Sequence, residues 1–64
     1  MRLVPIFTDR GLVYVNPMDV LGLCNTNDED AARGGTTIIV STGNWYTSAD
    51  INKVAAAIDR GLSS

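Results

Sequence analysis

The chain has 64 residues, one cysteine and a net charge of −2, which together indicate one small domain without an intrachain disulfide. It contains no histidine, which argues against a structural zinc site and against histidine-based catalysis. No stretch approaches the ~20 apolar residues of a membrane span, and the N-terminus does not resemble a signal peptide. We therefore expect a soluble, cytoplasmic protein whose single domain spans residues 1–64.

The first elements along the chain are predicted to be two strands joined by a tight turn. Residues 3–8 and 12–15 are rich in apolar and β-branched side chains, and Asp9-Arg10-Gly11 has the composition of a turn. Pro5 has no amide to donate to a ladder, so we expect the first strand at a sheet edge.

A short helical turn and a third strand are predicted next. Asn16 followed by Pro17 is the order typical of a helix N-cap and first helical position. Residues 20–24 then form the predicted third strand, in which Gly22 permits a bulge. The polar, glycine-ended segment 25–35 is expected to be a surface loop.

Two more strands and one helix complete the predicted fold. Residues 36–41 and 45–47 are expected to pair as a hairpin. Ser48 (or Thr47) is the predicted N-cap of the helix, and Gly61 is its predicted C-terminal stop. One apolar stripe marks the face that should be buried, namely Ile51, Val54, Ala55 and Ile58. The fold class is therefore α+β, with about five short antiparallel strands in a curled meander followed by a C-terminal helix.

The strands carry apolar side chains on both faces. Leu3 and Phe7 alternate with Val4 and Ile6 in the first strand, and the later strands show the same pattern. One helix of about twelve residues is ~18 Å long and covers one sheet face. The other face is covered either by curling of the sheet or by a second subunit, and we favour a homo-oligomer.

Catalytic and metal-binding motifs are absent from the sequence, so we expect neither an enzyme nor a bound cofactor or metal. There is no nucleophile elbow, P-loop or dinucleotide fingerprint. Cys24 is interpreted as a core thiol because it lies in an apolar strand. The run Asp28-Glu29-Asp30 lacks the spaced oxygens and glycine of a calcium loop and is interpreted as a solvated acidic loop.

Adjacent aromatic residues suggest one candidate ligand site. Trp45 and Tyr46 point to opposite faces of a strand, so one ring is free to stack on a nucleotide base. The side chains and amides that would complete such a site are those of Arg33, Gly34, Gly35, Thr36 and Thr37. The alternative is that both aromatic residues belong to the core and to a subunit interface.

From residue 12 to residue 62 the order of these features resembles the FlbD family of small proteins, which has phage-encoded relatives. The matching features are Val15-Asn16-Pro17, Val20-Leu21, Thr36-Thr37-Ile38-Ile39-Val40, Gly43 and the Ser48-capped helix bearing Ile51, Val54 and Ile58. The resemblance implies a compact protein with no catalytic residues to transfer. The acidic segment 25–33 and the pair Trp45-Tyr46 depart from the family pattern.

Three functions are consistent with these features. The first is a homo-oligomeric adaptor that binds a host or phage protein, and the resemblance suggests a phage origin for it. The second is a phage protein that sequesters a cyclic or ADP-ribose-type nucleotide in pockets between subunits. The third is a small nucleic-acid-binding regulator, which the net negative charge and the scattered basic residues disfavour.

Overall fold

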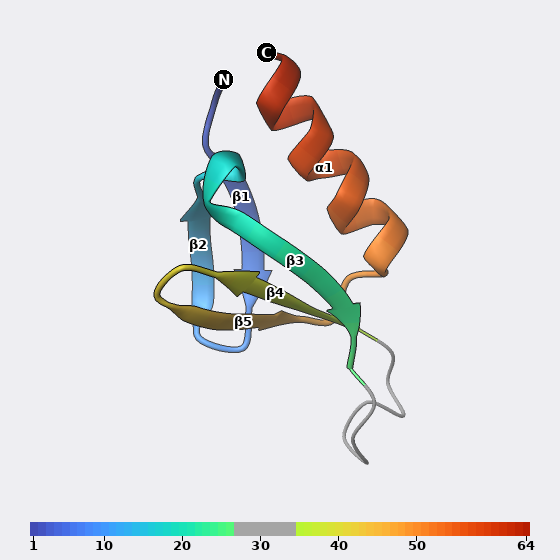
Figure 1. Ribbon diagram of the computed structural model, residues 1–64. Coiled ribbons are helices and arrows are strands. Elements are labelled where there is room, and N and C mark those ends of the chain that lie inside the picture. Colours follow the sequence, from blue (N-terminus) through green and yellow to red (C-terminus); the bar gives the residue numbers. More distant parts are fainter. Residues whose placement is uncertain (27–34) are drawn as a thin grey trace.

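A computed structural model of the chain describes residues 1–26 and 35–64, which form five antiparallel strands and one α-helix. In chain order the elements are β1 (Val4–Thr8), β2 (Gly11–Val15), the 3₁₀ turn η1 (Pro17–Asp19), β3 (Val20–Asn25), β4 (Thr36–Val40), β5 (Gly43–Thr47) and α1 (Ile51–Ser63). Figure 1 shows a β meander followed by the C-terminal helix, so the predicted α+β class is confirmed.

The strands form two sheets, a β1–β2 hairpin and a three-stranded sheet in the order β3-β4-β5. Within the described part of the chain β1 pairs only with β2, so its predicted position at an edge is confirmed. The predicted bulge at Gly22 is also present, because the register of β3 on β4 shifts between Val20 and Gly22. The Asn16 side chain accepts a hydrogen bond from the Met18 amide at 2.9 Å and so caps η1 as expected.

The meander curls so that its last strand returns to its first. The Asp9 amide, just beyond β1, donates to the Tyr46 carbonyl of β5 at 3.0 Å. The helix α1 packs beside β1, β3 and η1 (Figure 1). Seven buried apolar side chains form the core between these elements, namely Val4, Ile6, Val15, Ile38, Val40, Val54 and Ile58.

The N-cap of the helix lies two residues later than the predicted Ser48. Asp50 is the N-cap, and its side chain accepts from the Asn52 amide at 2.9 Å. The prediction of Ser48 (or Thr47) was wrong because Thr47 still belongs to β5, where it is buried and its hydroxyl accepts from the Ala49 amide.

The predicted helix stop at Gly61 was also wrong. The helix continues to Ser63, and Gly61 is a buried helical residue without a positive φ. Its carbonyl accepts from the Arg2 amide at 3.0 Å, and a Cβ at this position would lie 2.5 Å from Val4 Cγ2. Glycine is therefore required at position 61 because the N-terminal segment packs so closely on the helix that a Cβ has no room. It does not mark the end of the helix.

The buried face of α1 also differs from the prediction at one position. Val54 and Ile58 are buried and Ile51 is half-buried, as expected, but Ala55 is exposed. Ala57 takes its place and is packed against the core. The buried face is thus rotated toward β1, the strand that Gly61 also contacts.

Candidate functional site

The outer face of the β1–β2 hairpin carries four large apolar side chains that point away from the core. Their exposed fractions are 53% for Leu3, 77% for Phe7, 48% for Leu12 and 61% for Tyr14. Phe7 pairs with Leu12 across the hairpin, and Pro5 pairs with Tyr14. Directly paired residues lie on the same face of an antiparallel sheet, so these five residues form one surface, the hairpin face.

The alternation of the two strands explains this surface. Val4, Ile6 and Val15 turn inward and are buried, so the residues between them must turn outward. The outward positions are apolar as well, and the predicted two-sided pattern is therefore confirmed for the hairpin. Curling of the meander brings β1 to β5 but leaves the hairpin face exposed.

The second sheet is more polar on its outer side. Ile38 and Val40 are buried, whereas Thr37, Ile39, Asn44 and Tyr46 occupy the outward register positions, and Leu21 and Ile39 are the large apolar side chains exposed on this sheet. Among the described strands, the hairpin therefore carries the larger group of exposed apolar side chains.

The hairpin face is large enough to be an interaction surface. With about 150–250 Å² for an aromatic side chain, the exposed fractions of Phe7 and Tyr14 amount to roughly 200–350 Å². Leu3 and Leu12 add to this area, which then reaches the several hundred Å² that mark binding surfaces on monomers.

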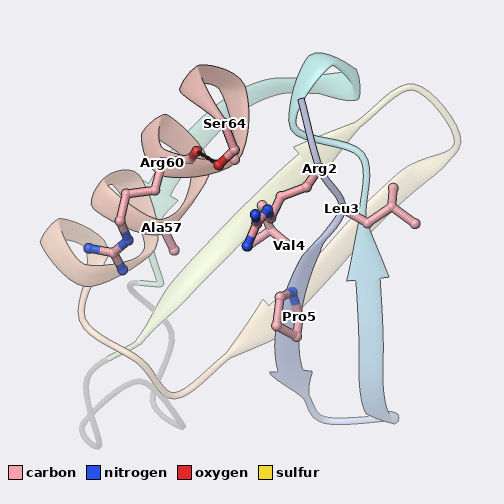
Figure 2. A pocket seen from close by; sticks show the side chains of 8 residues that line it. Arg2, Leu3, Val4, Pro5, Ala57, Arg60 and Ser64 are labelled. Atoms are coloured by element: carbon pink, nitrogen blue, oxygen red, sulfur yellow. Dashed lines mark hydrogen bonds between the residues drawn. The ribbon is translucent and has the colours of Figure 1, made fainter.

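A groove lies beside the hairpin face, between β1 and α1. It consists of two hollows of about 340 and 280 Å³ that share Pro5 and Ala57 in their linings. Figure 2 shows the first hollow, with Arg2 reaching from the segment before β1 and Arg60 and Ala57 on α1. Lys53 lines the second hollow. We call this feature the β1–α1 groove.

The sequence did not indicate this groove, because its basic residues are far apart in the chain and were interpreted as scattered. The hydrogen bond from the Arg2 amide to the Gly61 carbonyl brings the N-terminal segment to the end of α1. The spacing of Lys53 and Arg60, seven residues apart on one helix, was the available signal, because it places both side chains on one face.

The residues predicted to hold a nucleotide are only partly brought together. Arg33 and Gly34 lie outside the described residues. Gly35 lies against the Tyr46 ring, since a Cβ on this glycine would be 2.8 Å from the Tyr46 hydroxyl oxygen. Thr36, in contrast, is fully buried and its hydroxyl donates to the Ala49 carbonyl at 2.9 Å, so this hydroxyl is already engaged within the fold.

Trp45 lies on the inner side of β5, opposite Tyr46. It pairs with the buried Ile38, packs against the core and has the Arg10 guanidinium 5.9 Å from its ring centroid. Trp45 and Tyr46 therefore face opposite sides, as expected. The placement of Trp45 matches the alternative interpretation of a core aromatic more closely than that of a stacking platform.

The remaining sequence interpretations concern Cys24 and the acidic run. Cys24 is exposed, so its interpretation as a core thiol was wrong: it lies near the end of β3, at a position that faces away from the core. Asp28-Glu29-Asp30 lies outside the described residues. In the described ranges no three metal-binding side chains gather into a cluster, and no helix there is long and apolar enough to cross a membrane.

Comparison with protein-family models, with curated proteins and with solved structures finds no match to this chain. The resemblance to the FlbD family thus stays a prediction. The hairpin face and the β1–α1 groove are the features of the molecule that bear on its function.

Proposed function

We propose that this chain is a non-enzymatic, homo-oligomeric adaptor protein that binds another protein, and that its copies contact each other through the hairpin face. The observation that carries the proposal is the gathering of Leu3, Phe7, Leu12 and Tyr14 on one outward surface. Aromatic residues of this kind are enriched at protein interfaces, where they contribute a large share of the binding energy.

A second copy of the chain is the occupant that the physical properties of the surface favour. An outward sheet face packs on its own copy at about 10 Å, and a two-fold axis makes such a surface complementary to itself. The hairpin face supplies about half of the roughly 800 Å² per partner found in standard interfaces, so its rim must supply the rest. A core of seven apolar side chains also leaves a small domain with little stability to spare, which association increases.

The absence of catalysis is proposed from composition, because a chain without histidine has few groups that transfer protons near neutral pH. A cytoplasmic location is part of the same proposal. Cys24 is an exposed, unpaired thiol, and such thiols stay reduced in the cytoplasm.

The test is the mass of the protein in solution, measured by size-exclusion chromatography with light scattering at micromolar concentration. We expect the wild type to have the mass of a dimer or higher oligomer. The double variant Leu12→Ser/Tyr14→Ser should weaken association about tenfold or more. It should keep its circular dichroism spectrum, because both side chains are already about half exposed in one copy.

Leu21→Ser is the matched control. Leu21 is a leucine of 70% exposure on β3, outside the hairpin, and its replacement should leave the mass unchanged. A wild-type protein that is folded and monomeric at these concentrations would overturn the proposed assembly, as would a Leu21→Ser variant that dissociates as readily as the double variant.

A further inference from the structure

The β1–α1 groove collects positive charge on an acidic chain. Arg2, Lys53 and Arg60 line it, which are three of the five basic residues of a protein with net charge −2. None of the described residues that line the two hollows is an aspartate or glutamate. The groove is therefore locally basic although the protein as a whole is acidic, and a charge pattern of this kind steers acidic partners to one place.

The basic residues are arranged along a line. Lys53, Ala57 and Arg60 follow one another at intervals of four and three residues on α1, so they form one stripe of the helix. Lys53 and Arg60 are thus about 10 Å apart along the helix axis. Arg2 reaches from the segment before β1 toward the helix and lines the first hollow together with Arg60 (Figure 2).

These charges are available to a partner. Arg2, Lys53 and Arg60 are all exposed, and none of them forms an ion pair within the part of the chain that the structure describes. Arg10, in contrast, lies over the Trp45 ring.

Apolar side chains line the groove between these charges. Val4 and Val54 are buried core residues at its base, Ala57 is half-buried, and Pro5 is exposed on β1. Pro5 has no amide hydrogen, so the edge of β1 cannot form an uninterrupted ladder with an added strand. An occupant must therefore be recognised mainly by its side chains: apolar groups on the base and acidic groups beside the basic stripe.

We propose that the β1–α1 groove binds an extended acidic segment of a partner protein, in which aspartate or glutamate residues alternate with apolar ones. Extended chain advances about 3.3 Å per residue, so acidic residues two to four positions apart reach both Lys53 and Arg60. This inference rests on the proposed adaptor function and names the chemistry of the protein that the adaptor binds. A compact anion such as a nucleotide fits less well, because in the first hollow it would meet Arg2 and Arg60 but leave Lys53 of the second hollow unused.

The hairpin face adjoins the groove, since Leu3, Pro5 and Phe7 belong to both surfaces. Leu12 and Tyr14 lie only on the hairpin face, whereas Lys53 and Arg60 lie only on the groove. Variants at these two pairs therefore separate assembly from partner binding.

The experiment selects displayed short random peptides on the immobilised wild-type protein and on the Lys53→Gln/Arg60→Gln variant. We expect the wild type to enrich peptides that mix acidic and apolar residues, and the variant not to enrich them. An enriched peptide, labelled with a fluorophore, is then titrated by fluorescence polarisation. The double variant should bind it about tenfold more weakly, the loss expected for two partly exposed charge pairs, and added salt should weaken wild-type binding.

Arg10→Gln is the control, because it removes one positive charge from a residue outside the groove and should leave the affinity unchanged. The Leu12→Ser/Tyr14→Ser variant should change mass but keep peptide affinity, whereas Lys53→Gln/Arg60→Gln should do the reverse. Failure of the proposed assembly and failure of the proposed groove binding therefore give different results. The proposal is overturned if no acidic peptides are enriched, if Arg10→Gln loses as much affinity as the double variant, or if only free ADP-ribose or ATP binds the groove.

Discussion

Replacing Gly61 by alanine tests whether the packing of α1 on the N-terminal segment controls the stability of this fold. In an exposed helix interior this change stabilises by about 1 kcal/mol, because alanine is the better helix former. Here the added Cβ would lie 2.5 Å from Val4 Cγ2, 3.1 Å from the Arg2 carbonyl oxygen and 3.3 Å from Pro17 Cγ. Ordinary carbon–carbon contacts are about 3.5–4.0 Å, so one neighbour must move by about 1 Å.

None of the three neighbours moves freely. Val4 is 4% exposed and belongs to the core, and the Arg2 atom is part of the backbone. Overpacking of this kind costs about 1–3 kcal/mol, which exceeds the gain in helix propensity over most of its range. We therefore expect Gly61→Ala to destabilise the protein by about 1–2 kcal/mol and to lower the Tm by roughly 5–15 °C for a domain of this size.

Thermal and urea unfolding, followed by circular dichroism at one fixed protein concentration, measure the change. Ala56→Gly on the exposed side of α1 calibrates the propensity term and should cost about 1 kcal/mol. In a Val4→Ala background the clash is relieved, so Gly61→Ala should become neutral or stabilising, a coupling that a double-mutant cycle reports. A Gly61→Ala protein more stable than the wild type would refute the close packing.

Three further substitutions test other contacts of the fold. Asp50→Ala removes the helix cap and should cost about 0.5–2 kcal/mol in urea unfolding; an unchanged midpoint would mean that the cap contributes nothing. Thr36→Val leaves the Ala49 carbonyl without its buried donor and should cost about 1–3 kcal/mol, and a stability equal to that of the wild type would contradict the burial of this hydroxyl bond. Arg10→Gln should shift the fluorescence emission of Trp45, the single tryptophan, while changing stability by no more than about 1 kcal/mol; an unaltered spectrum would show that the guanidinium does not lie over the ring.

Local patterns in the sequence determined most of the secondary structure. Pro5 predicted an edge position for β1, because proline lacks an amide hydrogen. Asn16-Pro17 predicted a helical turn, because the Asn16 side chain can cap it and the fixed φ angle of Pro17 suits its first position. The alternation around Val4 and Ile6 also predicted that the hairpin would be apolar on both faces. These features depend on neighbouring residues, so a short stretch of sequence is enough to predict them.

Features that depend on distant contacts were mispredicted or missed. A glycine late in a helix is an ordinary stop signal, and only the crossing of the N-terminal segment shows that Gly61 is needed for close packing instead. Cys24 lies in an apolar strand, yet the register of β3 on β4 turns it outward. Of the predicted nucleotide site, Thr36 is engaged in a hydrogen bond to Ala49, which lies thirteen residues further along the chain.

The sequence alone thus determined an α+β meander with too many apolar strand positions for a single helix to cover, because periodicity and turn chemistry are local. Only the tertiary structure decided which of those positions remain exposed, since that depends on how far the meander curls. It also decided where positive charge collects, because Arg2 and Arg60 are 58 residues apart in sequence and become neighbours through the packing of the chain ends. Both proposed surfaces arise from that packing.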